Sequence, residues 1–215
     1  MGLTVPSRMI LAGLDTPDFQ YAQFCAAQSQ LSVQHLRDGA DGLFWHGVDV
    51  KTGKYSCCKW GRANGWTLMM QAEVLDALAS SKWPGAKAAL QTGQINFNAH
   101  CDALAKVQSA DGRWHQVLTN TSTYLESSGT AMYIVSMAMG IDRGWLDASK
   151  FSAVISKAWA GLSTQIDADG IVEGICDGFG IHPFESDYEA AKTLYGKSQP
   201  GLGSILKAAV LMATR

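Results

Sequence analysis

The segment at positions 60–66, Trp-Gly-Arg-Ala-Asn-Gly-Trp, brings two tryptophans and one arginine together within seven residues. A tryptophan side chain is a broad apolar plate with one polar edge, and a guanidinium is a planar fork that matches a carboxylate or a phosphate. Trp60 and Trp66 can therefore cover the faces of a ring, while Arg62 holds a negative charge. We expect this segment to bind an acidic, ring-shaped ligand.

The position of Arg62 relative to the next helix supports this interpretation. A helix is expected to begin near Asn64 or Gly65, which places Arg62 beside its N-terminus. The positive end of the helix dipole disfavours a cation there, and an anion bound by both Arg62 and the free backbone N–H groups relieves the conflict. This favours a carboxylate ligand. The alternative is that Arg62 pairs with an acid of the protein and that both tryptophans belong to the core.

Other residues near turns are candidates for the same site. Trp45 and His46 are candidate ligand contacts, and His46 is also a candidate proton-transfer partner. Trp114 and His115 lie at a corresponding place further along the chain and are candidates to line the same cleft. For each of them the alternative is ordinary structural packing. Glu126 either caps the helix after it or points into the cleft, and capping is the favoured interpretation.

An Asp-Gly turn followed by an extended segment occurs three times, with the aspartates at positions 41, 111 and 169. The spacings of 70 and 58 residues leave room for two helices in each period. Stacked helix pairs that present their loops on one rim form an α/α toroid or solenoid. The alternative is that Asp-Gly is merely a common turn dipeptide. That alternative does not explain why Trp is followed by His in two of the three segments.

The remaining sequence predicts the helices that such an architecture needs. Phe24 and Leu31, together with neighbouring alanines, are expected to form the apolar stripe of the helix that starts at Pro17, and Asp147 is expected to cap a later helix. Short extended segments are expected at 44–46 and 114–117. The expected helices cover about 5–14, 17–37, 65–78, 85–109 with a candidate break at 92–94, 127–139, 148–166 and a final stretch after 201.

Length and composition predict one globular domain over residues 1–215, and the expected helices make it all-α. The 215 residues are 47% hydrophobic and 17% charged, and the formal net charge of -2 disfavours a nucleic-acid partner. No apolar run reaches about 18 residues, so no membrane contact through a spanning helix is expected. The N-terminus lacks the pattern of a signal peptide, and the compartment stays open. The five cysteines show no metal-binding spacing, so free thiols and no metal are expected.

The motifs at 42–47, 60–66, 111–117 and 124–128 occur in the same order in the unsaturated glucuronyl and unsaturated rhamnogalacturonyl hydrolases, glycoside hydrolase families 88 and 105. The chain resembles these families over almost its whole length. The Trp-Gly-Arg-Ala-Asn-Gly-Trp run is the specific part of the match. A late Gly-x-Gly at 201–203 supports it.

The resemblance implies an (α/α)6 toroid that acts on oligosaccharides left by polysaccharide lyases, which carry a 4,5-unsaturated uronic acid at the non-reducing end. In these families an Asp protonates C4 and helps water to add at C5, and the glycosidic link falls apart after the resulting hemiketal opens. No metal or organic cofactor is used. The contacts to the uronate ring and carboxylate carry over to His46, Trp60, Arg62 and Trp66.

Two departures from the family pattern matter. The stretch at 4–14 is similar to the family segment that comes directly after the catalytic Asp, so this Asp is expected at or just before Met1 and no residue of the chain matches it. We therefore expect the chain to lack the first helix pairs of the family, to form an incomplete toroid and to be inactive alone. Pro200 also stands where family members often carry a charged residue.

Two alternatives to a hydrolase of the kind described remain open. The first is a non-catalytic carbohydrate-binding remnant that keeps Trp60, Arg62 and Trp66. The second is another toroid enzyme with paired carboxylates. The only candidates for such acids on loops are Asp49, Glu126 and Asp177, and none has a partner at an obvious spacing.

Overall fold

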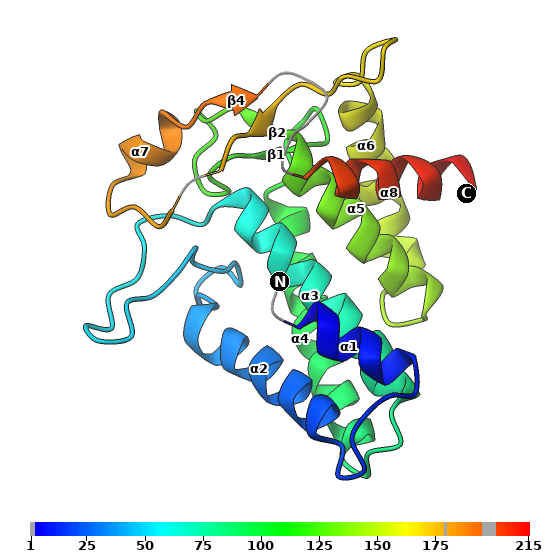
Figure 1. Cartoon of the computed structure of the whole chain (residues 1–215). Coiled ribbons are helices and arrows are strands. Elements are labelled where there is room, and N and C mark those ends of the chain that lie inside the picture. Colours follow the sequence, from blue (N-terminus) through cyan, green and yellow to red (C-terminus); the bar gives the residue numbers. More distant parts are fainter. Residues whose placement is uncertain (1–2, 179, 195–200) are drawn as a thin grey trace.

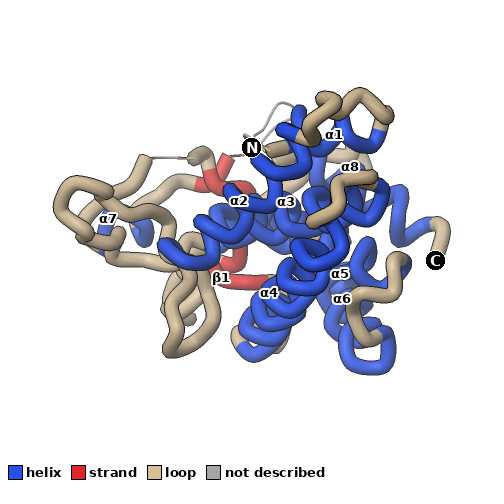
Figure 2. Tube along the Cα trace, turned by 90° about the horizontal axis from the view of Figure 1, so that it is seen from below, coloured by secondary structure: helices blue, strands red, loops and turns tan. Residues whose placement is uncertain are grey.

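The computed structural model describes residues 3–178, 180–194 and 201–215, which are mainly helical (Figures 1 and 2). Pro200 and the start of the chain at Met1 lie outside the described residues. The elements, in chain order, are α1 (Thr4–Leu11), α2 (Gln20–Leu36), α3 (Gly61–Ser80), α4 (Ala86–Lys106), β1 (Trp114–His115), β2 (Leu125–Glu126), α5 (Ser127–Asp142), α6 (Ala148–Ser163), β3 (Ile175–Cys176), α7 (Glu185–Glu189), β4 (Thr193–Leu194) and α8 (Leu202–Ala213).

The long helices form two rows. α1, α3, α5 and α8 pack side by side in this order, and α2, α4 and α6 each pack against the helix that precedes them in the chain. The described residues thus supply three helix pairs and α8. Alternation between one row and the other is the arrangement of an α/α toroid, so the predicted fold class is confirmed. Over the residues that the structure describes, no helix is long and apolar enough to cross a membrane.

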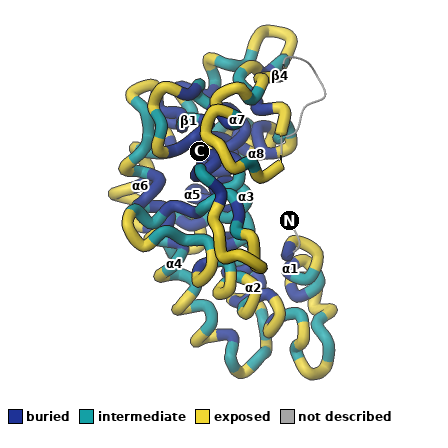
Figure 3. Tube along the Cα trace, turned by 90° about the vertical axis from the view of Figure 1, so that its left-hand side faces the viewer, coloured by how far each residue is buried: buried dark blue, intermediate teal, exposed yellow. Residues whose placement is uncertain are grey.

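Burial results from this arrangement, as Figure 3 shows. α3 and α5 have neighbours on several sides, so most of their residues are buried, whereas α1 and α2 expose much of their surface. The large side chains of the main core are fully buried and come from several helices and the first strand. They include Leu68, Leu75, Phe97, Leu104, Trp114, Tyr133, Ile134 and Met137.

The apolar stripe predicted for α2 is wrong in its large residues, although the neighbouring alanine Ala22 is buried as expected. Phe24 and Leu31 are 48% and 41% exposed, and the residues that α2 buries are Ala22, Cys25 and Val33. Small side chains allow α2 to lie close to its neighbours, so the packed face of this helix is not the face that carries the large residues.

The start of α2 also lies later than predicted. Thr16 Oγ1 accepts a hydrogen bond of 2.8 Å from the Gln20 backbone N–H, and Asp15 Oδ1 accepts one of 3.1 Å from Tyr21 N–H. These two side chains therefore satisfy the first backbone N–H groups of α2. Because Phe19 has a left-handed backbone with φ of 60°, the helix begins after it rather than at Pro17.

The structure differs from the predicted helices at two glycines, one at the start of α3 and one within α4. α3 begins at Gly61, four residues earlier than expected, so Arg62 lies in its first turn. α4 is continuous through Gly93, at the place of the candidate break. A Cβ atom at Gly93 would lie 2.7 Å from Leu75 Cδ2, so this glycine allows the close approach of α3 and α4 rather than a break.

The remaining predictions are mostly confirmed at the level of elements. Asp147 caps α6, since its Oδ1 accepts a 2.8 Å hydrogen bond from Ser149 N–H. β1 pairs with β2, and β3 pairs with β4, both antiparallel. The segment at 44–46 forms no strand, and Phe44 makes only a single bridge to Arg37. β3, α7 and β4 carry no clear sequence signal and were missed.

Candidate functional site

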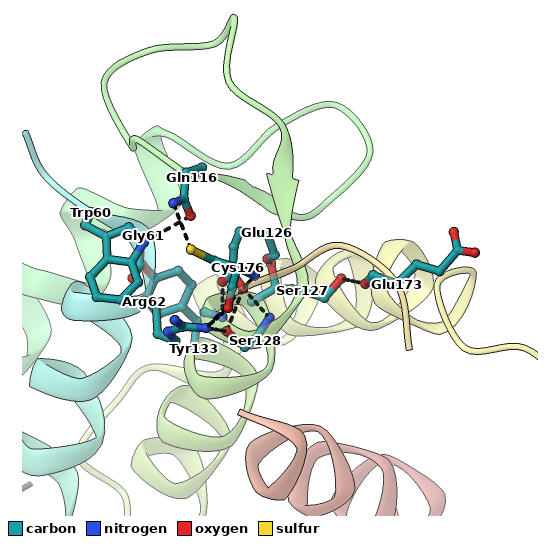
Figure 4. A network of polar contacts seen from close by, with 12 residues as sticks. Trp60, Gly61, Arg62, Gln116, Glu126, Ser127, Ser128, Tyr133, Glu173 and Cys176 are labelled. Carbon is teal, nitrogen blue, oxygen red and sulfur yellow. Dashed lines mark hydrogen bonds and ion pairs between the residues drawn. The ribbon is translucent and has the colours of Figure 1, made fainter. Parts of the chain in front are cut away.

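The candidate site lies where the N-terminal ends of α3 and α5 meet β3 (Figure 4). Arg62, in the first turn of α3, is only 3% exposed. Its Nη1 atom donates to the Cys176 carbonyl at 2.6 Å and to Ser128 Oγ at 3.3 Å, and the guanidinium lies 4.7 Å from the centre of the Trp60 ring. Three segments far apart in the sequence therefore meet at this guanidinium.

Glu126 supplies the negative charge nearest to Arg62. Its Oε1 atom lies 4.0 Å from Arg62 Nη1 and accepts hydrogen bonds from Ser128 N–H, Ser128 Oγ and Cys176 N–H. Its Oε2 atom accepts one of 2.6 Å from Gly129 N–H. The carboxylate is 1% exposed and caps α5, as the favoured interpretation predicted.

This geometry corrects the argument made from the helix dipole. An anion does lie between Arg62 and a helix N-terminus, but it is the Glu126 carboxylate and the helix is α5 rather than α3. The alternative considered for Arg62, a pair with an acid of the protein, is what the structure contains. Trp60 is likewise 6% exposed and contributes to a buried cluster.

One edge of the Arg62 guanidinium nevertheless has no hydrogen-bond partner among the described residues. Within the described part of the chain, Nε and Nη2 make no hydrogen bond. Gly178 lies over this edge with φ of 104°, and a Cβ atom there would be 2.8 Å from Arg62 Nη2. The glycine therefore leaves space at the nitrogens that a bidentate contact to a carboxylate would use.

Gln116 is a member of this cluster that sequence reasoning missed. Its Oε1 atom accepts a 3.0 Å hydrogen bond from Trp60 Nε1, and its Nε2 atom donates to Cys176 Sγ at 3.1 Å. Gln116 is completely buried. Both ends of the amide are used, so it fixes the plane of the Trp60 ring relative to β3.

Counting from the glycines of the three repeated Asp-Gly turns identifies Gln116 from the sequence. Gly42, Gly112 and Gly170 all have left-handed backbones, with φ of 80°, 99° and 75°, so the three turns correspond. Two residues after each glycine lies a buried apolar side chain, namely Phe44, Trp114 and Val172. Four residues after the first two glycines lie His46 and Gln116, and both contact Trp60. The glycines, not the Trp-His pairs, give the correct register.

Trp114 and His115 therefore do not occupy the predicted positions. Trp114 is 1% exposed, its Nε1 atom donates to the Leu104 carbonyl at 2.8 Å, and its ring packs edge-on against Tyr133. It belongs to the core. His115 Nδ1 lies 2.5 Å from the Thr123 carbonyl, so this half-buried ring holds the loop between β1 and β2.

Trp45 and Trp66 differ in their relation to the cluster. The Trp45 ring lies 4.5 Å from Lys59 Nζ and 5.8 Å from the Tyr55 ring, and so packs apart from the neighbouring His46 side chain. Lys59 in turn pairs with two aspartates near the first turn. Trp66 is half-buried one helical turn after Arg62, on the same face of α3.

The segment that contains α7 covers the cluster and supplies a partner for His46. Tyr188 is completely buried, and its hydroxyl lies 2.7 Å from His46 Nδ1. Asn120 Nδ2 donates to both Glu185 and Glu189 of α7, at 2.8 Å and 2.9 Å, and so joins this segment to the β1–β2 loop. Sequence reasoning missed these contacts because 142 residues separate His46 from Tyr188.

The surroundings of His46 define its protonation. Burial, together with the smaller effect of the positive charges of His182 and Arg62, lowers the pKa of His46 from 6.5 to about 4. Burial raises the pKa of Tyr188 to about 12, so its hydroxyl keeps a proton to donate. The His46 ring is therefore neutral at neutral pH, and its Nδ1 atom shares a hydrogen bond with the protonated Tyr188 hydroxyl.

The other acids considered lie on exposed loops. Asp49 and Asp177 are exposed, and the Asp49 carboxylate accepts a hydrogen bond from Lys51 N–H within its own turn. Among the described residues, no three His, Cys, Asp or Glu side chains gather closely enough to hold a metal ion. The cysteines at 25, 57, 58, 101 and 176 are free thiols.

Comparison with known proteins identifies the family to which the chain is similar. The model of Glycosyl Hydrolase Family 88 matches residues 6–215. The chain is 29% identical over 157 residues to the unsaturated 3S-rhamnoglycuronyl hydrolase of Formosa agariphila, covering 71% of the chain and 39% of that protein. It is 26% identical over 148 residues to the unsaturated rhamnogalacturonyl hydrolase YesR of Bacillus subtilis, covering 68% and 39%. The chain thus spans well under half the length of these relatives.

A solved structure shares the fold. The glycoside hydrolase from family 105 of C. acetobutylicum ATCC 824 superposes with a TM-score of 0.85 at 24% identity, covering 99% of this chain and 63% of that one. At this identity the likeness concerns the arrangement of the helices.

Proposed function

The chain belongs to Glycosyl Hydrolase Family 88, and from this membership we propose that it forms the uronate-binding wall of a hydrolase. The substrate class is an oligosaccharide with a 4,5-unsaturated uronic acid at its non-reducing end. The names of two relatives, an unsaturated 3S-rhamnoglycuronyl hydrolase and an unsaturated rhamnogalacturonyl hydrolase, support this substrate class. Residues 1–215 are proposed to act as one domain, with further helix pairs of the toroid supplied outside them.

The edge of the Arg62 guanidinium that has no hydrogen-bond partner among the described residues carries the proposal. A uronate carboxylate can bind Nε and Nη2 beneath Gly178, where a side chain would obstruct it. Nη1 stays bound to Cys176 and Ser128, so the fork is held in place before the ligand arrives. The adjacent Trp66 is proposed to cover one face of the sugar ring.

His46 is proposed to orient the substrate. Its ring lies against Trp60, and burial keeps the ring neutral, so we propose that it contacts the sugar as an uncharged group. Trp60 keeps the ring of His46 in position, since the two ring centres lie 4.7 Å apart. Trp45 is proposed only as a support, because its ring packs on Lys59.

The chemistry requires an acid that these residues do not supply. Hydration adds a proton to C4 and the oxygen of water to C5, and the hemiketal that results opens and releases the next sugar. Glu126 is unsuited to this role because both of its oxygens already accept hydrogen bonds at the end of α5. We therefore assign proton donation to an Asp outside residues 1–215, as the resemblance implies, and assign no metal or cofactor to the reaction.

Loss of the ultraviolet absorbance of the conjugated double bond tests the proposal. The full-length protein should consume an unsaturated disaccharide produced by a pectin or rhamnogalacturonan lyase, whereas residues 1–215 alone should bind it without consuming it. Binding without turnover by the full-length protein would favour the second candidate, a carbohydrate-binding protein, which the capping role of Glu126 supports. Absence of both binding and turnover would contradict the proposal.

A further inference from the structure

The side chain of Asn64 joins two separate segments that carry residues of the site. Asn64 lies near the start of α3, two residues after Arg62, and is completely buried. Its Nδ2 atom donates to the Phe44 carbonyl at 2.9 Å and to the Trp60 carbonyl at 3.1 Å, and its Oδ1 atom accepts from Phe44 N–H at 2.8 Å. One amide thus binds the backbone two residues before His46 and the backbone of Trp60.

A fourth hydrogen bond saturates this amide. The backbone groups around Asn64 decide which end is oxygen, and His100 Nε2 lies 3.2 Å from that oxygen. Burial lowers the pKa of His100 from 6.5 to about 3, so its ring is neutral and donates the Nε2 proton to an atom that can only accept. The ring of His100 also packs against Phe44, with the ring centres 4.6 Å apart. Both donors and both acceptor positions of the Asn64 amide are therefore used.

Asn64 takes the place of a neighbouring strand for the segment at 44–46. The bridge between Phe44 and Arg37 is made by hydrogen bonds of the residues on either side of Phe44, so the N–H and C=O of Phe44 itself are directed the other way. In a sheet, these two groups would pair with the peptide of another strand. Here they pair with the Asn64 amide, which fixes the segment to the start of α3.

The two segments joined in this way carry a pair of rings that faces the site. The ring centres of His46 and Trp60 lie 4.7 Å apart. Groups that contact a ligand must be held to within a fraction of an ångström, and hydrogen bonds from buried residues behind them provide this precision. The backbone contacts of Asn64 lie two residues from His46 and at Trp60 itself, so they are placed to set the spacing of this pair.

We propose that Asn64 is a positioning residue, which holds the His46 ring against the Trp60 ring through its hydrogen bonds to both segments. Asn64 makes no contact with a sugar itself, because it is completely buried. The effect on sugar affinity rests on the proposed function, whereas the spacing of the two rings can be measured without a sugar. If Asn64 served stability alone, its loss would lower the free energy of unfolding and leave the two rings in place.

Asn64→Ala removes the hydrogen bonds of the side chain without adding volume. The ring current of Trp60 shifts the His46 ring protons, so ¹H NMR of the sugar-free chain reports on the spacing of the rings. In the variant these signals should move toward those of an unshifted histidine, and the affinity for an unsaturated disaccharide should fall about tenfold by calorimetry. Ile155→Ala, a buried truncation on α6, is the matched control, which should lose stability but change neither readout.

Hydrogen exchange covers the case in which Asn64→Ala does not fold. In the unaltered chain, Phe44 N–H should exchange as slowly as N–H groups in the middle of α3, because its acceptor is a buried side chain. Faster exchange at Phe44, or a folded Asn64→Ala with unchanged His46 signals or unchanged affinity, overturns the proposal. If the unaltered chain binds no unsaturated disaccharide while the His46 signals respond as expected, the proposed function fails and the positioning of His46 by Asn64 stands.

Discussion

The Glu126 carboxylate lies 4.0 Å from the Arg62 guanidinium, and both side chains are almost fully buried, at 1% and 3% exposure. The same carboxylate accepts from the first N–H groups of α5 and from Cys176. The Glu126 carboxylate therefore links Arg62 to the start of α5 and to β3. Because both of its oxygens already accept hydrogen bonds, Glu126 positions the site and does not take part in the reaction.

Glu126→Gln should destabilise the fold strongly. The variant leaves Arg62 buried without a counter-charge and turns an NH₂ group toward N–H donors, so the free energy of unfolding should fall by about 3–5 kcal/mol. Denaturant unfolding measures this. Glu173→Gln, an exposed acid in the same region, is the matched control and should change stability by less than about 0.5 kcal/mol. Equal effects of the two substitutions would show that the Arg62–Glu126 pair contributes nothing.

The protonation of His46 should depend on Tyr188. We expect the Tyr188 hydroxyl, 2.7 Å from Nδ1, to donate to it, so ¹⁵N NMR of the unaltered chain should find the neutral form with its proton on Nε2. Tyr188→Phe keeps the ring but removes the donor, so a mixture of both neutral forms should appear. Tyr55→Phe, which alters an exposed tyrosine, should have no effect. Finding the proton on Nδ1 in the unaltered chain would refute the assignment.

His100 should make the fold sensitive to acid. Its pKa is lowered from 6.5 to about 3 by burial, so between these values the unfolded chain binds a proton that the folded chain does not. The stability due to neutral His100 is thus present above pH 6.5 and lost as the pH falls toward 3.

Replacing His100 by Gln should therefore reduce the slope of unfolding free energy against pH. The expected reduction is about 1.4 kcal/mol per pH unit across this window. The exposed substitution Gln91→Asn on the same helix is the control. An unchanged slope in the His100 variant would contradict the prediction.

Gly178→Ala should impair the site more than Gly180→Ala. Gly178 has φ of 104°, and its Cβ atom would lie 2.8 Å from Arg62 Nη2, whereas nothing lies within 4 Å of a Cβ atom at Gly180. The left-handed conformation alone costs about 1–2 kcal/mol for alanine. Affinity for an unsaturated disaccharide, measured by calorimetry, should fall in the first variant only. Equal affinities of the Gly178→Ala and Gly180→Ala variants would show that Gly178 does not contribute to binding.

The sequence predicted the parts of the molecule that depend on local pattern. Periodicity and caps such as Asp147 located the long helices, and the spacing of three Asp-Gly turns indicated stacked helix pairs. The prediction that Phe24 and Leu31 lie on the packed face of α2 was wrong, because residue size does not reveal which face of a helix is packed. A neighbouring helix that approaches through Ala22 and Cys25 leaves no such signal.

The candidate site was only partly predictable for a related reason. Arg62 and Trp60 are recognisable from their spacing, but their partners come from distant segments. Gln116 and Tyr188 reach the cluster through tertiary packing, and no local pattern marks either of them for this role. Counting from the left-handed glycines would have found Gln116, whereas Tyr188 required the structure.

Binding of an unsaturated disaccharide to Arg62→Lys tests the central claim most directly. Lysine keeps the positive charge beside Glu126 but lacks the second edge of the fork, so the variant should fold and yet lose about 1.5–3 kcal/mol of binding free energy. Arg143→Lys, which alters a surface pair with Asp76, is the control. The account predicts that calorimetry finds weakened binding only in the Arg62 variant. Equal affinity of both variants and the unaltered chain would contradict the assignment of the uronate carboxylate to Arg62.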